Sequence, residues 1–453
     1  MKRGLLILLV GTALLLVTVP PAPTQVPGSL DRRPERTLPA PPTKELIATL
    51  GTGDFQDRER ATQQLLAQGV ALIPELKAAL AASSNPEATE RLESLIHSIR
   101  VKQLFEPTRI TLKLESATPK TTFHELARVS GYQMPIPDDT KVKYPVSFDV
   151  REKPFWEVLR SINHQSGIAI DANNWALGMD SVNPFVVVDG PFRITLESIH
   201  MCCTNQFSRP KNGVFRQEED QYANIRLESE PKLQMLGLSE IKLTRVVDNL
   251  GNNILETNDP RLEWYYSNES RSGRQSLKHS ESFIIGVERK DRTATEIVDL
   301  KGVAKVVVVR DIRTDITVEN LHLTGKQTFT GKTFTLDLEP ARVHDQDWQL
   351  EFNATVTQNH KEPYDKLELE ALPARIIIEN DQGDQAQIAL TLLSQTVRGG
   401  FVRPNLDNHF GRYKLTATAP DGVKASSFTR MRILDWECAS KEIPFGFKNI
   451  PLP

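Results

Sequence analysis

The sequence predicts a multidomain, mainly β protein with a short α-helical segment, a small α+β domain and two β-sandwich domains. Helical spacing of apolar residues over 44–105, two strand–helix units over 108–180 and short β-branched runs from residue 185 onward support this fold class. A chain of 453 residues is long enough for about three domains. The predicted fold class rests on the successive change from helical spacing to strand–helix units and then to β-strand runs along the chain.

Residues 1–23 have the pattern of a secretory signal peptide. Lys2 and Arg3 precede an apolar run from Gly4 to Val19, and prolines end the run. This run is shorter than the roughly 20 apolar residues that a stable membrane span needs. We therefore expect an exported protein that is periplasmic or associated with the cell envelope. Because no clear Ala-x-Ala cleavage site follows, an uncleaved signal that anchors the chain to the membrane is the alternative.

Composition restricts the partners and the redox chemistry. Residues 24–43 are rich in proline and predict a solvated linker. Without the basic pair in the signal, the formal net charge moves from −3 to −5, and the remaining Lys and Arg are scattered. We therefore expect no nucleic-acid partner, and membrane contact only if the signal is uncleaved. With only three cysteines, we expect hydrophobic cores rather than disulfides to stabilise the fold.

Residues 44–106 are expected to be helical. Asp54 is a candidate N-cap, Gly69 ends the second helix, and Asn85 followed by Pro86 marks the start of the last one. The run "DFQDRERATQQLLAQGVALIPELKAAL" resembles a HEAT-type helical repeat. Since such repeats stabilise one another by stacking, one or two of them are expected to brace a neighbouring domain.

Residues 108–183 are expected to form the α+β domain. A strand, a helix led by Pro119 and ended by Gly131, and then a second strand are followed by a helix led by Pro154 and ended by Gly167. The "F-D-V-x-x-x-P-F-W-x-V-L-x-x-I" run resembles the short N-terminal domain of secretins and TonB-dependent receptors. No series of barrel strands follows it. The resemblance therefore implies protein–protein docking and not transport.

Residues 185–325 and 326–453 are expected to form two related β-sandwich domains of the Ig-like type. Short apolar runs bounded by Gly, Asn and Asp are typical of sandwiches. Two offsets also indicate an internal repeat, since Gly251 and Gly383 lie 132 residues apart and Asn320 and Asn449 lie 129 apart. Two similar domains explain this agreement better than one large sheet does.

The chain lacks the patterns of common catalytic sites. It has no Gly-x-Ser-x-Gly elbow, no P-loop and no dinucleotide fingerprint, so we expect no enzyme and no cofactor. His200, Cys202 and Cys203 are soft metal ligands. On a strand, however, only His200 and Cys202 share a face, which favours half-buried cysteines over a metal site. A disulfide from Cys202 or Cys203 to Cys438 is a further hypothesis.

One aromatic and basic cluster is a candidate interaction patch. It consists of Trp264, Tyr265, Tyr266, Arg271 and Arg274. Clustered aromatics next to basic residues occur at protein and glycan contact sites. Packing at the edge of a sandwich is the more common role of such residues, and it stays the alternative.

The order of segments as a whole resembles that of uncharacterised secreted multidomain proteins of planctomycete-like bacteria. The "DFQDRERATQQLLAQGVALIPEL" run and the "IPFGFKNIPLP" terminus carry this resemblance, which implies no activity. We therefore expect a non-catalytic, extracytoplasmic interaction or scaffold protein whose partner is an unknown envelope protein. The first alternative is an accessory of a secretin or TonB-type system that docks through residues 108–183. The second is a metal-binding protein that uses His200, Cys202 and Cys203.

Overall fold

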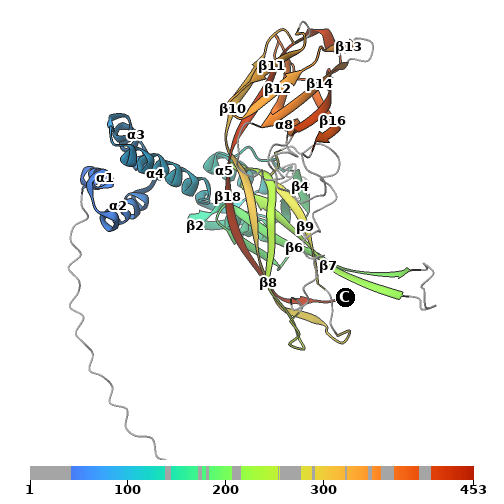
Figure 1. Cartoon of the computed structure of the whole chain (residues 1–453). Helices are drawn as coiled ribbons and strands as arrows, with labels where there is room; N and C mark the ends of the chain where they lie inside the picture. Colours follow the sequence, from blue (N-terminus) through green and yellow to red (C-terminus); the bar gives the residue numbers. More distant parts are fainter. Residues whose placement is uncertain are drawn as a thin grey trace, which may run out of the picture. The chain divides into compact units, whose positions relative to one another are not determined.

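The structure is a computed structural model, and it is mostly β, with several antiparallel sheets and a few helices (Figure 1). It describes residues 42–137, 144–171, 176–179, 183–206, 216–253, 255, 277–287, 291–321, 324–344, 349–358, 372–396 and 410–453. The predicted signal peptide and all but the last two residues of the predicted linker lie outside these ranges. The chain divides into two compact units at Leu65 and Leu66, and each unit is described by itself.

The first unit contains helix α1 (Thr43–Thr52) and most of helix α2 (Phe55–Gln68). Its buried side chains follow helical spacing and include Leu50 and Leu65, each with no exposed surface. Asp54 lies between the helices, and its Oδ1 accepts a hydrogen bond from the Asp57 backbone N–H at 2.8 Å. The predicted N-cap is confirmed.

The second unit begins with the end of α2, the short 3₁₀ turn η1 (Gly69–Leu72) and the helices α3 (Ile73–Ala82) and α4 (Pro86–Leu104). Asn85 caps α4 by accepting from the backbone N–H groups of Glu87 and Ala88, as predicted. By length and composition, the stretch Phe55–Ala82 is apolar enough to cross a membrane. It is interrupted at Gly69, whose φ of +71° is incompatible with a continuous α-helix.

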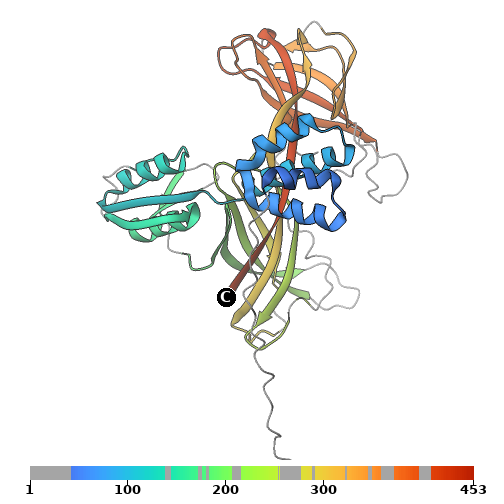
Figure 2. The same cartoon turned by 90° about the vertical axis from the view of Figure 1, so that its left-hand side faces the viewer.

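The α+β module follows with the predicted alternation. Strand β1 (Arg109–Ala117) pairs antiparallel with β2 (Val146–Pro154), and β3 (Ile168–Asp171) pairs with β4 (Ala176–Met179). Helices α5 (Pro119–Ser130) and α6 (Phe155–Ser166) pack beside the β1–β2 pair (Figure 2). Both helices end at a left-handed glycine, Gly131 or Gly167, as predicted. Helical spacing predicts inward positions on both helices, and of these Phe123, Leu126, Phe155, Val158, Leu159 and Ile162 are buried, whereas Ala127 is only half-buried.

The described residues from 186 onward form three further antiparallel sheets. The first has the order β5 (Val186–Asp189), β6 (Phe192–Gln206), β7 (Arg216–Ser229), β9 (Ser280–Gly286). The second has the order β15 (Ile376–Asn380), β18 (Phe428–Pro451), β10 (Glu296–Val318), β8 (Gln234–Asp248). The third has the order β11 (Gln327–Thr330), β12 (Phe334–Leu338), β14 (Gln349–Gln358), β17 (Phe410–Thr418), β16 (Gln387–Thr396), with β13 (Arg342–His344) beside β14.

These sheets enclose two hydrophobic clusters. The first β core includes Phe192, Ile225, Phe283, Val306 and Ile443. The second β core includes Phe334, Phe352, Ile378, Leu415 and Ile433. The β10–β18 pair contributes to both cores, and both strands run continuously between them (Figure 1).

The two β cores are therefore not consecutive segments of the chain. Sequence patterning predicts a boundary between residues 325 and 326, and yet Ile443 and Phe445 pack in the first core. Conversely, Ile316 and Val318 pack in the second core.

Sequence patterning also predicts only short strands, and this expectation is wrong. Strand β10 has 23 residues and β18 has 24. Gly302 lies within β10, where the ring of Phe445 occupies the space next to it. A Cβ atom at Gly302 would lie 2.5 Å from Cζ of Phe445. The glycine thus serves close packing and not chain reversal.

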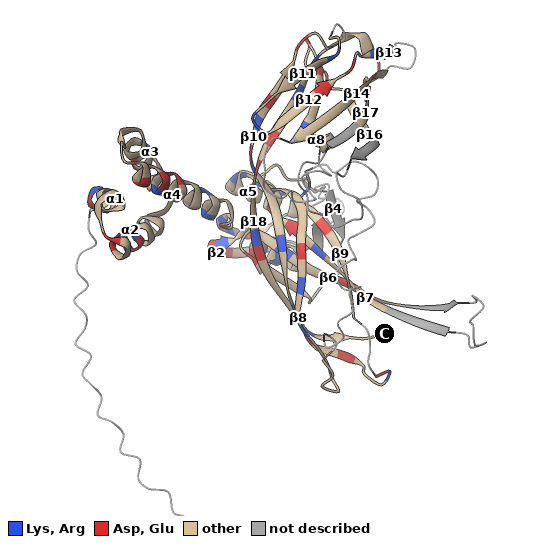
Figure 3. Cartoon of the chain, in the orientation of Figure 1, with Lys and Arg blue, Asp and Glu red and all other residues tan. Residues whose placement is uncertain are grey.

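Charged side chains of both signs are interspersed along the strands (Figure 3). Asp299 on β10, for example, pairs with Arg245 of β8 at 2.7 Å and with Lys301 at 3.1 Å. These neighbouring cations hold the pKa of Asp299 below its usual value against the opposing effect of burial. Such alternation of charge protects an exposed sheet from pairing with other chains.

Candidate functional site

A buried carboxylate joins the α+β module to the β strands. Glu230 follows β7 and has no exposed surface. Its two carboxylate oxygens accept from the backbone N–H of Thr108 at 3.1 and 3.2 Å, and one accepts from the Tyr132 hydroxyl at 2.8 Å. The Lys232 ammonium lies 3.5 Å from the same carboxylate and also donates to the carbonyl of Glu106. These hydrogen bonds and the nearby ammonium offset the cost of burying the carboxylate, and they hold Thr108 and Tyr132 against the end of β7.

Tyr132 acts as a hydrogen-bond donor in this joint. A carboxylate can only accept, so the phenol donates to Glu230 and receives the hydrogen bond of the Thr108 hydroxyl. Burial, and then the negative charge of Glu230, raise the pKa of Tyr132 far above its ordinary value. The phenol therefore keeps its proton and has no role as a base.

A second contact strengthens the same joint. Arg193 on β6 forms a two-pronged ion pair with Glu228 on β7, with N–O distances of 2.6 and 2.7 Å. The Arg193 guanidinium lies 4.4 Å from the centre of the Trp156 ring, and Trp156 of α6 donates its indole N–H to the Pro191 carbonyl at 2.9 Å. Two independent contacts therefore hold α5 and α6 against the first β core.

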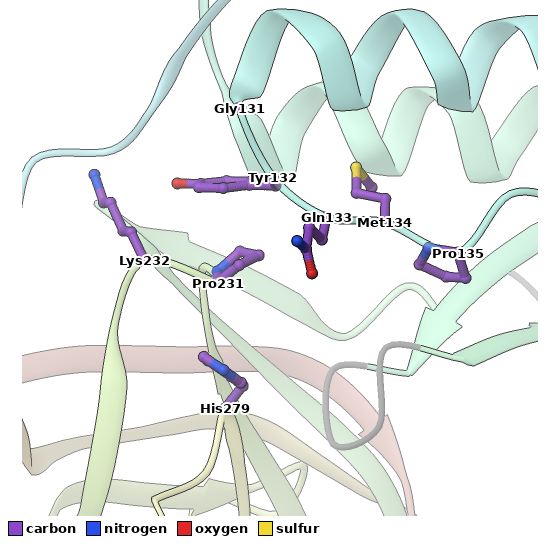
Figure 4. Close-up of a pocket in the computed structure, with 8 residues that line it drawn as sticks. All are labelled: Gly131, Tyr132, Gln133, Met134, Pro135, Pro231, Lys232 and His279. Carbon is purple, nitrogen blue, oxygen red and sulfur yellow. The ribbon is translucent and has the colours of Figure 1, made fainter. Parts of the chain in front are cut away.

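An open pocket of about 710 Å³ lies beside the Glu230 joint (Figure 4). One wall is the extended segment after α5, which contains Tyr132, Gln133 and Met134. The facing wall holds Pro231 and His279. The remaining lining residues are Gly131, Pro135 and Lys232. The surface is thus partly apolar, with an exposed amide from Gln133 at its mouth.

His279 is a neutral imidazole in this pocket. Its Nδ1 lies 2.8 Å from the Leu233 carbonyl oxygen, which can only accept, so Nδ1 carries the proton. Burial lowers the pKa of His279, although the hydrogen bond to Leu233 opposes this effect.

Two polar groups beside the pocket already have partners in the joint. The Tyr132 hydroxyl donates to Glu230, and the Lys232 ammonium contacts Glu230 and donates to the Glu106 carbonyl. The lining thus combines apolar side chains with a few polar groups, a composition common in ligand-binding pockets. Among the described residues, no group of three or more His, Cys, Asp or Glu is placed to hold a metal ion.

The predicted metal ligands lie on β6, away from this pocket. The His200 ring stacks on Tyr222 of β7, with ring centres 5.1 Å apart, and its Nε2 lies 2.6 Å from the Ser198 hydroxyl oxygen. Cys202 and Cys203 are on the same strand, but their side chains lie outside the described part of the chain. The metal site is therefore untested and stays a prediction.

Cys438 lies on β18 opposite Val309 of β10. Its half-buried side chain packs beside Leu236, Val307 and Trp436, and its thiol lies 3.7 Å from the Trp436 carbonyl oxygen. The disulfide to Cys202 or Cys203 also stays a prediction. The patch of Trp264, Tyr265, Tyr266, Arg271 and Arg274 falls wholly outside the described residues.

Sequence reasoning missed Tyr132, Trp156, Arg193, Glu228 and Glu230. The two glutamates read as surface residues, because carboxylates are seldom buried unless they are paired. No pattern in the sequence marks them, and only the structure shows that Leu227, Glu228 and Ser229 are buried in succession at the end of β7.

Comparisons with protein-family models, curated proteins and solved structures find no match to this chain. The resemblances of residues 44–105 and 108–180 therefore stay expectations, and the joint and its pocket are the features on which a function can be built.

Proposed function

We propose that this protein is a non-catalytic interaction or scaffold protein of the bacterial cell envelope, exported by its N-terminal signal. One observation carries the proposal. The buried ionisable groups around Glu230 and Arg193 are used to fasten the α+β module to the β strands. Buried ion pairs and hydrogen bonds at this joint hold the α+β module against the β strands, as a scaffold requires.

We also propose that the two β cores are sandwich modules of the Ig-like type. The support is that each lies between antiparallel sheets with alternating inward residues, as in β12, where Phe334, Leu336 and Leu338 are buried. Sandwiches of this type commonly present loops and edges to protein partners.

An accessory role in a secretin or TonB-type system is the second candidate. It is favoured by the α+β module, in which a strand and a glycine-ended helix occur twice in succession. In this case residues 108–183 would dock onto the envelope machinery, with the pocket beside Glu230 at one end of the docking surface.

Photo-crosslinking tests the proposal. A photoreactive side chain placed at Gln133, in the pocket, is compared with one placed at His124, which is exposed on α5. In living cells of the source bacterium, we expect a discrete crosslinked envelope protein from position 133 and none from position 124. Fractionation of the same cells checks export. Equal products at both positions, or a cytoplasmic protein, would contradict the proposal.

A further inference from the structure

The two β regions contain the same hydrogen-bonded turn, in which the first and last residues are Asp and Asn in one case and Asn and Asp in the other. After β8, the Asp248 carboxylate accepts from the backbone N–H groups of Leu250 and Asn252 at 2.9 and 2.8 Å, and from the Asn252 side-chain amide at 2.8 Å. After β15, Asn380 accepts from the N–H groups of Gln382 and Asp384 at 3.0 and 2.9 Å, and its amide donates to Asp384 at 2.9 Å. Corresponding residues lie 132 positions apart.

The strands around these turns correspond as well. Gly251 and Gly383 occupy the same place in their turns, with φ of +84° and +89°. The β8–β10 ladder places Asp248 opposite Ile297, and the β15–β18 ladder places Asn380 opposite Phe428. Each turn therefore lies opposite the start of a long strand, β10 in the first case and β18 in the second.

Each long strand packs in one β core at its start and in the other β core at its end. Strand β10 contributes Ile297 and Val306 to the first β core and Ile316 and Val318 to the second. Strand β18 does the reverse, with Ile433 in the second core and Ile443 in the first. The two strands pair antiparallel over their whole length, from Glu296 opposite Pro451 to Val318 opposite Met431.

Polar side chains hold the crossing ends in place. Asp315, near the end of β10, accepts from the backbone N–H groups of Lys332, Thr333 and Phe334 in the turn between β11 and β12. Lys441, in the second half of β18, donates to Asp189 at the end of β5 at 2.6 Å. In both cases the crossing strand is held at the first hairpin of the core it enters.

We infer that residues 184–453 are an internal duplication whose two repeats exchange the second halves of their last strands. The segment Ala439–Pro451 is then a strap that begins in the second repeat and closes the first β core. Its buried side chains Ile443, Phe445, Phe447 and Ile450 fill that core. The inference does not depend on the scaffold role proposed above, but it explains how the chain connects the two β cores through one continuous strand pair.

Amide hydrogen–deuterium exchange of the full chain tests whether the second half of β18 belongs to the first β core. Ile443→Asp and Ile433→Asp change equally buried isoleucines on one strand, each with no exposed surface. We expect Ile443→Asp to speed exchange at least about tenfold in β6, β7 and β9, with a smaller effect in β12 and β14. We expect Ile433→Asp to give the opposite distribution.

Three further variants keep the test decisive. Glu442→Ala changes an exposed neighbour and should leave both cores protected. Ile443→Val and Ile433→Val make the same comparison if an aspartate variant does not fold. If Ile443 variants instead loosen β12 and β14 and spare β6, β7 and β9, the strap belongs to the second core and the inference is wrong.

Discussion

At the scale of single residues, the buried carboxylate of Glu230 has a structural role, because its hydrogen bonds join the α+β module to the β strands. It accepts three hydrogen bonds from two elements of the α+β module and lies next to one ammonium group. A buried charge is tolerated only when its partners replace the lost water, so each partner has a measurable share in the joint.

Removing the carboxylate should therefore open the joint. Glu230→Ala leaves the Thr108 N–H and the Tyr132 hydroxyl without their acceptor, and we expect a loss of roughly 3 kcal/mol in the free energy of unfolding. Tyr132→Phe removes only one donor and should cost about 1 kcal/mol. Urea unfolding of the two variants measures both values. Equal losses would show that the carboxylate does not bridge the two modules.

His279 should make stability depend on pH. Burial lowers its pKa in the folded protein, so the unfolded chain binds a proton more readily. Stability is therefore complete above the unfolded value of about 6.5 and declines as the pH falls below it. The thermal midpoint of His279→Gln should change less between pH 7.5 and pH 5.5 than that of the parent protein. An unchanged slope would assign the effect to another group.

At the scale of elements, the sequence predicts helix ends well, because a capping residue and its hydrogen-bond partners lie close together in the sequence. Asn85, Asp54 and the two left-handed glycines after α5 and α6 work within a few residues of their own helix ends. The two turns after β8 and β15 are also local. In each turn an Asn amide donates to an Asp carboxylate four positions away, and the hydrogen bond forms whichever of the two residues comes first.

This reversal can be tested by exchanging the pair. Asn252→Asp places two carboxylates face to face at a distance that now joins an amide and a carboxylate, and we expect a loss of about 1–2 kcal/mol at pH 7. Adding Asp248→Asn re-creates the arrangement of the second turn and should restore most of that loss. A double variant no more stable than Asn252→Asp alone would show that the two turns are not equivalent.

At the scale of the whole molecule, the β10–β18 pair is the element on which both cores depend. Its register brings Val309 opposite Cys438, near the point where both strands pass from one core to the other. The pair makes the two modules share buried surface, which links their unfolding.

A cysteine at Val309 should report this register. In Val309→Cys, mild oxidation should produce a disulfide between positions 309 and 438, since opposed residues on paired strands have Cβ atoms close enough to join. Peptide mapping by mass spectrometry identifies the bond. The same mapping of the parent protein tests the predicted disulfide, which would appear as Cys438 joined to Cys202 or Cys203. Failure of position 309 to pair with Cys438 in a Cys202→Ser, Cys203→Ser background would contradict the register.

The sequence by itself determined the features that depend on neighbours along the chain. The helix caps, the strand–helix alternation of residues 108–171 and the inward faces of α5 and α6 follow from periodicity and from Gly, Pro and Asn at element ends. The 132-residue offset of Gly251 and Gly383 also indicates a repeat from the sequence alone.

Only the tertiary structure decided which strands share a core and which charges are buried. The close packing at Gly302 depends on Phe445, which lies far along the chain. Glu230 reads as a surface residue because its partners Thr108 and Tyr132 precede it by 122 and 98 positions. Local patterns encode the conformation of a segment, whereas burial and pairing depend on contacts between distant segments, and one sequence does not specify those contacts locally.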